Sequence, residues 1–109
     1  MLAKKYRLPI QSVIGKNGES FKTPFFLVKK FPGGFPYPRF GVIISKKVSD
    51  KATERNRLKR IIFSAIESFL AEQKNKLPAK DFLIIVSPKI KELEKEKIIE
   101  QINLCSKHF

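Results

Sequence analysis

The sequence has little of what protein-based catalysis usually needs. Cys105 is the only cysteine among 109 residues, which excludes an internal disulfide framework and a cysteine-based zinc cluster. His108 is the only histidine, so a multi-histidine metal site or a Ser-His-Asp triad is hard to build. We therefore expect no catalytic residue and no metal site in this chain.

Long apolar runs are also missing. Apolar residues make up 42% of the sequence, but in short stretches, so we expect a folded core and no membrane span. At 12.6 kDa the chain is long enough for one hydrophobic core, and we predict a single domain over residues 1–109. No apolar stretch follows the basic start (Lys4, Lys5 and Arg7), so we expect no secretory signal and a cytoplasmic protein.

Acidic residues are scarce, and the imbalance is uneven along the chain. Lys and Arg number 23 against 10 Asp and Glu, giving a formal net charge of +13. Residues 1–60 carry 15 basic and 3 acidic side chains, whereas residues 61–109 carry 8 and 7. Such a field attracts a polyanion by releasing its counterions, so nucleic acid or an anionic membrane surface is the expected partner. A membrane-surface binder would need a basic amphipathic helix with a large apolar face or a lipid anchor, and neither is evident.

Hydrophobic periodicity predicts the order strand, strand, helix, strand, helix after a short N-terminal helix or turn. Segment 32–38, rich in Pro and Gly, reads as a hairpin-type connection between the first two strands. This order is typical of an α/β (α+β) two-layer sandwich, with helices packed on a small sheet. The predicted elements are a short helix or turn at 8–15, strands at 23–31, 39–47 and 81–87, and helices at 54–73 and 89–109.

The sequence also predicts the caps and the buried faces of the helices. Pro9 suits the first position of the short helix and Gly15 its C-terminal cap. Ser49 and Thr53 are two candidate N-caps for the middle helix. The apolar positions of that helix recur at three- and four-residue spacing from Leu58 onward, which predicts one buried face. In the last helix the buried face would contain Ile98, Ile99, Ile102 and either Leu104 or Cys105.

The most informative motif is a basic cluster around the start of the middle helix, which we call the basic box. On a helical wheel, Asn56 and Arg60 lie opposite the apolar stripe, while Arg57 and Lys59 flank it. Arginine presents a planar fork to phosphate oxygens, and a helix N-terminus adds positive field. The box consists of Lys46, Lys47, Arg55, Asn56, Arg57, Lys59 and Arg60.

The alternative is that the basic box is only a solvated helix face. Isolated basic runs often have no binding role, and such patterns mislead. Here Arg55, Arg57 and Arg60 lie close together at the start of the helix, and only Asp50 and Glu54 are close enough in sequence to neutralise them. Surface ion pairs contribute about 0–1 kcal/mol each, so stability gives little reason for the cluster. A binding role is therefore favoured.

Residues 39–62, RFGVIISKKVSDKATERNRLKRII, closely resemble the characteristic region of the bacterial ribonuclease P protein subunit. That pattern is a strand ending in two basic residues, a short connection, and Arg-Asn-Arg-x-Lys-Arg opening a helix. The resemblance continues less specifically through residues 78–89 and the last helix, covering about two-thirds of the chain.

The resemblance implies helices packed on a mixed sheet, with a left-handed crossover joining two parallel strands through the middle helix, whereas ~98% of crossovers are right-handed. It implies a ribonuclease P holoenzyme, an endonuclease whose RNA subunit removes the 5′ leader of precursor tRNA using Mg²⁺. The basic box would contact that catalytic RNA, and a cleft would hold the single-stranded leader. No cofactor bound by the protein, no small-molecule substrate and no membrane is implied.

The chain departs from the resembled pattern at its start. The family usually begins with a longer helix whose phenylalanines line the leader cleft, whereas here the first helix is short and interrupted by Pro9. Phe25, Phe26 and Phe63 are the possible replacements for leader contacts. For Phe25 and Phe26 the alternative is packing in the core, and for Phe63 it is packing under segment 32–38 or the first strand. Phe63 stands where the family often has a basic residue.

Two other function classes stay open at this point. A ribosomal or RNA-assembly protein with a similar fold would bind RNA without any catalytic partner. A membrane-surface or acidic-protein binder would show no preference for folded RNA.

Overall fold

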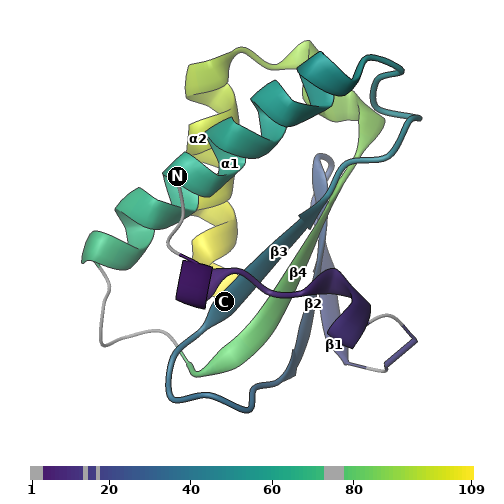
Figure 1. Cartoon of the computed structure of the whole chain (residues 1–109). Helices are drawn as coiled ribbons and strands as arrows, with labels where there is room; N and C mark the ends of the chain where they lie inside the picture. Colours follow the sequence, from purple (N-terminus) through teal and green to yellow (C-terminus); the bar gives the residue numbers. More distant parts are fainter. Residues whose placement is uncertain (1–3, 14, 17, 73–77) are drawn as a thin grey trace.

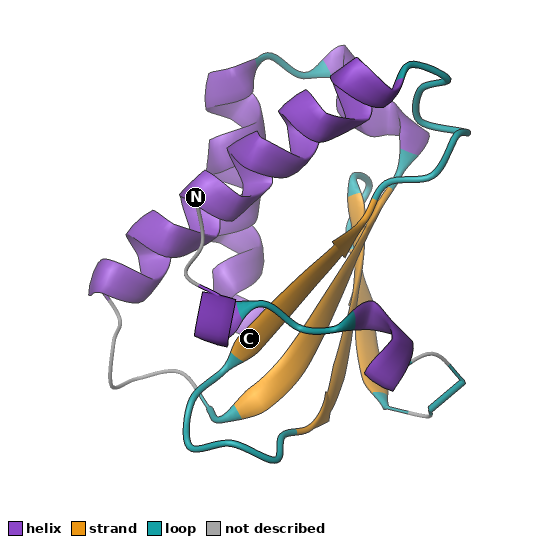
Figure 2. Ribbon diagram, viewed as in Figure 1, coloured by secondary structure: helices purple, strands orange, loops and turns teal. Residues whose placement is uncertain are grey.

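The computed structural model describes residues 4–13, 15–16, 18–72 and 78–109, and in these ranges four strands and two α-helices form (Figures 1 and 2). The strands are β1 (Glu19–Lys22), β2 (Phe26–Pro32), β3 (Arg39–Ile43) and β4 (Lys80–Val86). The α-helices are α1 (Ala52–Glu72) and α2 (Lys95–Cys105), and the 3-10 turns are η1 (Lys4–Tyr6), η2 (Ile10–Ser12), η3 (Pro88–Glu92) and η4 (Ser106–His108).

The four strands form one mixed sheet in the order β1-β2-β4-β3. β1 and β2 are antiparallel, β2 and β4 are antiparallel, and β3 runs parallel to β4 with Phe40 opposite Phe82. β3, α1 and β4 therefore form a parallel crossover unit, as the resemblance implies; its left hand stays a prediction. The α/β class with helices packed on a small mixed sheet is confirmed.

The prediction of a hairpin across segment 32–38 is wrong, because β4 lies between β2 and β3. The physical reason is burial. Residues 81–84 of β4 are consecutively buried, and a strand buried on both faces is most stable with a neighbour on each side. β3 consequently becomes an edge strand.

The two faces of the sheet are covered differently (Figure 1). α1 and α2 pack together on one face, where Phe40, Phe82 and Ile84 join them in the main core. The N-terminal segment crosses the other face, where Leu8 and Val13 form a smaller cluster with Phe31 and Leu83. The edge strand β3 therefore lies between α1 on one side and the N-terminal segment on the other.

Several boundaries differ from the predicted ones. α1 begins at Ala52, so Thr53 lies inside the helix rather than capping it. Ser49 forms a turn just before the helix, its Oγ accepting from the Lys51 N–H at 3.2 Å. β1 was not predicted, because its sequence, ESFK, has no apolar alternation and three of its four residues are exposed.

At the two ends of the described chain the local predictions are partly confirmed. Pro9 precedes η2 rather than opening it, and Gly15 follows with φ of 82°, a left-handed conformation that suits glycine. In α2 the Cys105 side chain is buried in the main core, whereas Leu104 is 47% exposed. No helix within the described ranges has both the length and the apolarity to cross a membrane.

Candidate nucleic-acid interface

One face of α1 borders a groove of about 550 Å³ that follows the edge of β3. Thr53, Asn56, Arg60 and Phe63 are spaced by three and four residues, so they form one row along the helix. All four line the groove, together with Lys59 beside them. Its volume lies in the range of about 300–1,000 Å³ that is typical of ligand sites.

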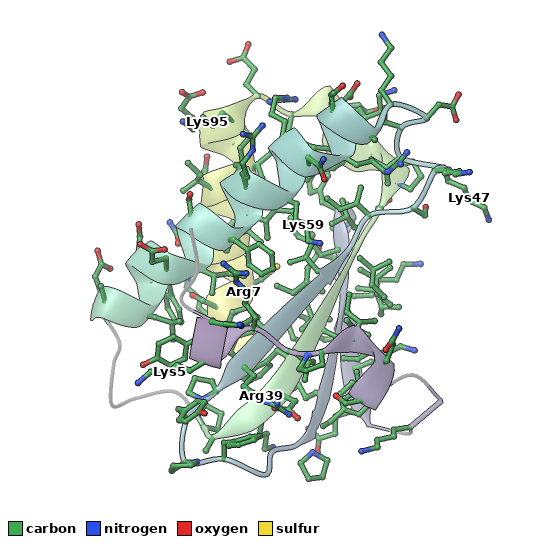
Figure 3. All side chains as sticks on the ribbon, in the orientation of Figure 1. Lys5, Arg7, Arg39, Lys47, Lys59 and Lys95 are labelled. Carbon is green, nitrogen blue, oxygen red and sulfur yellow. The ribbon has the colours of Figure 1, made fainter. Side chains whose placement is uncertain are left out.

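The N-terminal segment forms the opposite wall of the groove. Arg7 pairs with Phe40 in a parallel β-bridge, and the Leu8 N–H donates to the Phe40 carbonyl at 2.9 Å. These backbone contacts fix the segment against the edge of β3, so Arg7 and Lys59 approach the groove from different elements (Figure 3). Cationic side chains therefore border the groove on both sides.

The floor of the groove is apolar. It is formed by Phe40, Gly41 and Val42 of β3, and the Phe40 and Val42 side chains are buried. An apolar floor between basic walls suits a nucleotide, because the base can lie against carbon atoms while its phosphates meet the cations.

The basic box is mostly unpaired. Its members other than Arg55 are exposed, and in the described parts of the chain no ion pair or hydrogen bond engages their side chains. Sequence reasoning predicted that acidic residues would be too few to neutralise them, and this is confirmed. The exposed, unpaired residues are Lys46, Lys47, Asn56, Arg57, Lys59 and Arg60.

Arg55 is the exception in the basic box. It is half-buried, and its Nη1 donates to the Ser49 backbone carbonyl at 2.8 Å. This hydrogen bond ties the first turn of α1 to the connection that follows β3. Arg55 therefore helps to hold the basic box in place. The sequence pattern did not separate this structural role from a role in binding.

The box residues separate into two sets around α1. Asn56, Lys59 and Arg60 line the groove, whereas Arg57 and the lysine pair at 46–47 do not. The lysine pair lies in the turn between β3 and α1, and Figure 3 shows Lys47 pointing outward from that end of the molecule. The basic box therefore presents polar and cationic side chains both in the groove and outside it.

The three phenylalanines proposed as leader contacts have different surroundings. Phe26 is 1% exposed in the main core, so the prediction of a leader contact at Phe26 is wrong. Phe25 is half-buried in the turn between β1 and β2, packs against the main core, and does not line the groove. Phe63 is 4% exposed in the main core and also lines the groove, so a leader contact at Phe63 stays a prediction.

Sequence reasoning missed Arg7 as a member of the site. Its charge was visible, but its place on the opposite wall depends on the bridge to Phe40, some thirty positions further along the sequence. The prediction of a short N-terminal helix gave no signal that the segment would pair with an edge strand.

Two other ionisable groups are committed to the fold. Arg39 donates from Nε and Nη2 to the two carboxylate oxygens of Asp81, at 3.0 and 2.9 Å. The hydrogen bond to Asp81 raises the pKa of Arg39 against the opposing effect of burial. Burial also raises the pKa of the Cys105 thiol. Among the described residues no three His, Cys, Asp or Glu side chains converge as metal ligands.

Comparison with known proteins gives a consistent result. The family model for ribonuclease P matches residues 4–109. The ribonuclease P protein component of Edwardsiella ictaluri is 41% identical over 80 residues, which cover 73% of this chain and 64% of that protein. The corresponding protein of Thermotoga petrophila is 35% identical over 95 residues, covering 87% and 74%. The match therefore spans slightly less than two-thirds of the first of these relatives.

Solved structures of the same family share the fold. The RNase P protein of Staphylococcus aureus superposes with a TM-score of 0.76 at 26% identity, covering 94% of this chain and 93% of that one. The RNase P protein from Thermotoga maritima gives a TM-score of 0.68 at 28% identity, with coverage of 90% and 93%. Both likenesses extend over nearly the whole chain.

Proposed function

Because the chain belongs to the ribonuclease P protein family, we propose that it is the protein subunit of a bacterial-type ribonuclease P. In this proposal a partner RNA cleaves precursor tRNA at the 5′ side, and the chain supplies binding and positioning. The observation that carries the proposal is the unpaired basic box at the start of α1, beside a groove with an apolar floor.

The outward-facing part of the box would bind the catalytic RNA. Arg57 is exposed and has no partner in the described parts of the chain, so phosphate binding would not require breaking an existing ion pair. The turn of Lys46 and Lys47 adds two further cations close to the same end of α1. Each phosphate neutralised in this way releases counterions, which supplies affinity without base recognition.

The groove would hold the single-stranded leader. Lys59 and Arg60 on one wall and Arg7 on the other would neutralise its phosphates, and Asn56 can donate to a phosphate or a base edge. A base would pack against Phe63 and the apolar floor.

Mg²⁺, which the family resemblance implies for the cleavage, would not be held by this chain. The described residues offer no convergent set of carboxylate, histidine or cysteine ligands, so they do not fit a metal site. In this proposal RNA phosphates bind the ion, and the contribution of the chain is to orient the leader and to lower the repulsion between two RNA molecules.

The direct test is a reconstitution. The purified chain is added to a bacterial-type catalytic RNA at low Mg²⁺, and 5′ processing of a precursor tRNA is measured. We expect faster cleavage with the chain than without it, and no cleavage by the chain alone. Hydrolysis by the polypeptide in the absence of RNA, or no stimulation of the catalytic RNA, would contradict the proposal.

A further inference from the structure

A second group of aromatic and cationic side chains lies beyond the groove, at the connection between β2 and β3. The rings of Phe35 and Tyr37 are stacked, with centroids 5.5 Å apart and planes at 25°. Tyr37 meets Tyr6 edge to face at 5.6 Å. The Lys5 ammonium lies 4.9 Å from the Tyr6 centroid and 5.4 Å from that of Tyr37, and the Arg39 guanidinium lies 4.4 Å from that of Phe35. We call these five residues the loop cluster.

The loop cluster is built rigidly. Arg39 is fixed by its two hydrogen bonds to Asp81, so the ring of Phe35 packs against a guanidinium that cannot move freely. Proline residues restrict the connecting segment, and Pro38 is buried. The aromatic surface is therefore already in place before any ligand arrives.

Despite this fixed geometry, the loop cluster leaves a large ring in water. Phe35 is 45% exposed, and in the described parts of the chain only Leu104 is a comparably exposed large apolar side chain. Phe35 belongs to neither hydrophobic cluster of the protein. The ring contributes little to the core, and it stacks on Tyr37, over which the exposed cation Lys5 lies.

We propose that the loop cluster stacks unpaired nucleotides of the 5′ leader after the leader leaves the groove, an inference that rests on the proposed function. Arg7 lines the groove, and the neighbouring Tyr6 contacts Tyr37 of the loop cluster. Figure 3 shows Arg7 below Lys59 of α1, with Lys5 and Arg39 further down toward this loop. The groove and the loop cluster are therefore connected through the neighbouring residues Tyr6 and Arg7.

The chemistry of the loop cluster favours single-stranded nucleic acid over another partner. Every base has a face that can stack on Phe35 or Tyr37, and Lys5 can neutralise a backbone phosphate at the same time. Asp81 is already paired with Arg39, so it does not oppose an incoming phosphate. Recognition would depend on leader length rather than on leader sequence.

The test compares precursor tRNAs whose leaders have graded lengths. Fluorescently labelled precursors are bound to the holoenzyme reconstituted from the catalytic RNA and the full chain. For Phe35→Ala we expect affinity to fall roughly five- to tenfold for a long leader, from the loss of one stacked base. A leader too short to leave the groove should bind the variant and the wild-type protein equally well.

Matched controls separate this role from folding. Leu104→Ala removes a side chain of similar exposure on α2. It should not change the affinity for the long or for the short leader. Phe35→Trp keeps an aromatic surface and should retain binding of the long leader. Phe35 is exposed, so Phe35→Ala should leave the melting temperature close to that of the wild-type protein.

Each contrary outcome is informative. Equal affinity of Phe35→Ala and wild type for the long leader would overturn the inference while leaving the proposed function intact. Equal weakening for short and long leaders, or weaker binding to the catalytic RNA without precursor, would place the loop cluster on another part of the RNA and would also overturn it. Absence of any stimulation by the wild-type chain would overturn the proposed function together with this inference.

Discussion

The arginine at the start of β3 and an arginine on the helix that follows this strand have opposite roles. At the start of the strand, the Arg39 side chain is 15% exposed and donates two hydrogen bonds to Asp81, whose side chain is 7% exposed. Beyond its other end, Arg57 on α1 is exposed and has no partner within the described residues. The contrast shows that the presence of a satisfying partner, and not the charge itself, distinguishes an arginine that holds the fold from one available for a ligand.

The largest expected effect lies at the paired arginine. Arg39→Ala would leave the Asp81 carboxylate nearly buried without its counter-ion, and we expect the free energy of unfolding to fall by about 2–3 kcal/mol. This is below the ~3–5 kcal/mol typical of fully buried pairs, because the Arg39 side chain keeps some contact with water. Urea denaturation measures the loss. Affinity for the catalytic RNA in the absence of precursor should not change.

A double substitution sharpens this prediction. Arg39→Met combined with Asp81→Leu removes both charges and should recover most of the stability, since an apolar pair of similar volume often replaces an ion pair at little cost. If Arg39→Ala alone were as stable as the wild-type protein, the pair would not be structural, and the contrast between the two arginines would disappear.

The next effect lies at the unpaired arginine. Arg57→Ala removes a phosphate-binding group without disturbing a partner, so we expect roughly tenfold weaker binding to the catalytic RNA, about 1.4 kcal/mol, with the melting temperature nearly unchanged. Filter binding and thermal denaturation on the same preparation measure both quantities. A large loss of stability with unaltered RNA affinity would show that Arg57, like Arg39, stabilises the fold instead of binding RNA.

A smaller effect is expected at the buried Cys105, where the dependence of stability on pH should change. Arginines stay charged into the alkaline range, whereas the pKa of the Cys105 thiol is raised by burial. The contribution of the protonated Cys105 thiol to the free energy of unfolding is therefore complete below the ordinary thiol pKa of about 8.5. It is lost as the pH rises through the folded-state pKa. Cys105→Ala should lower stability at neutral pH but show a weaker further decline in alkaline denaturation curves. Parallel curves for the two proteins would contradict this.

The smallest effect is expected at an exposed pair on α2. The Lys97 Nζ and Glu100 Oε2 atoms lie 3.3 Å apart, but the two side chains are 65% and 56% exposed. Lys97→Ala should change the free energy of unfolding by at most about 0.5 kcal/mol, and it should not weaken RNA binding. A change as large as that of Arg39→Ala would mean that exposure does not set the strength of ion pairs in this protein.

The sequence predicted those elements whose side chains follow a strong periodicity. β2, α1 and β4 appear close to their expected positions, because their apolar residues are consecutive or helically spaced. β3 ends at Ile43 instead of at 47, and the helix predicted over 89–109 is divided into η3, α2 and η4. β1 was missed because its short polar sequence carries no such pattern. Neighbourhood in the sheet was predicted wrongly, since the connection 32–38 looks the same whether or not β4 inserts beside it.

The candidate site shows the same division. The wheel positions of Asn56 and Arg60 predicted that they lie away from the core stripe, and both residues line the groove. The hydrogen bond of Arg55 to Ser49 and the place of Arg7 were not predictable, because both depend on backbone positions fixed by tertiary structure.

The central claim is that unpaired arginines at the start of α1 bind folded RNA through its phosphates. The most direct test measures how affinity for the catalytic RNA depends on salt, for the wild-type chain and for a Lys47→Ala/Arg57→Ala double variant. We predict a steep log–log slope for the wild type, lowered in magnitude by about 0.7–0.9 for each phosphate that the variant no longer neutralises. A wild-type affinity that does not fall with salt, or identical slopes for the two proteins, would contradict the account.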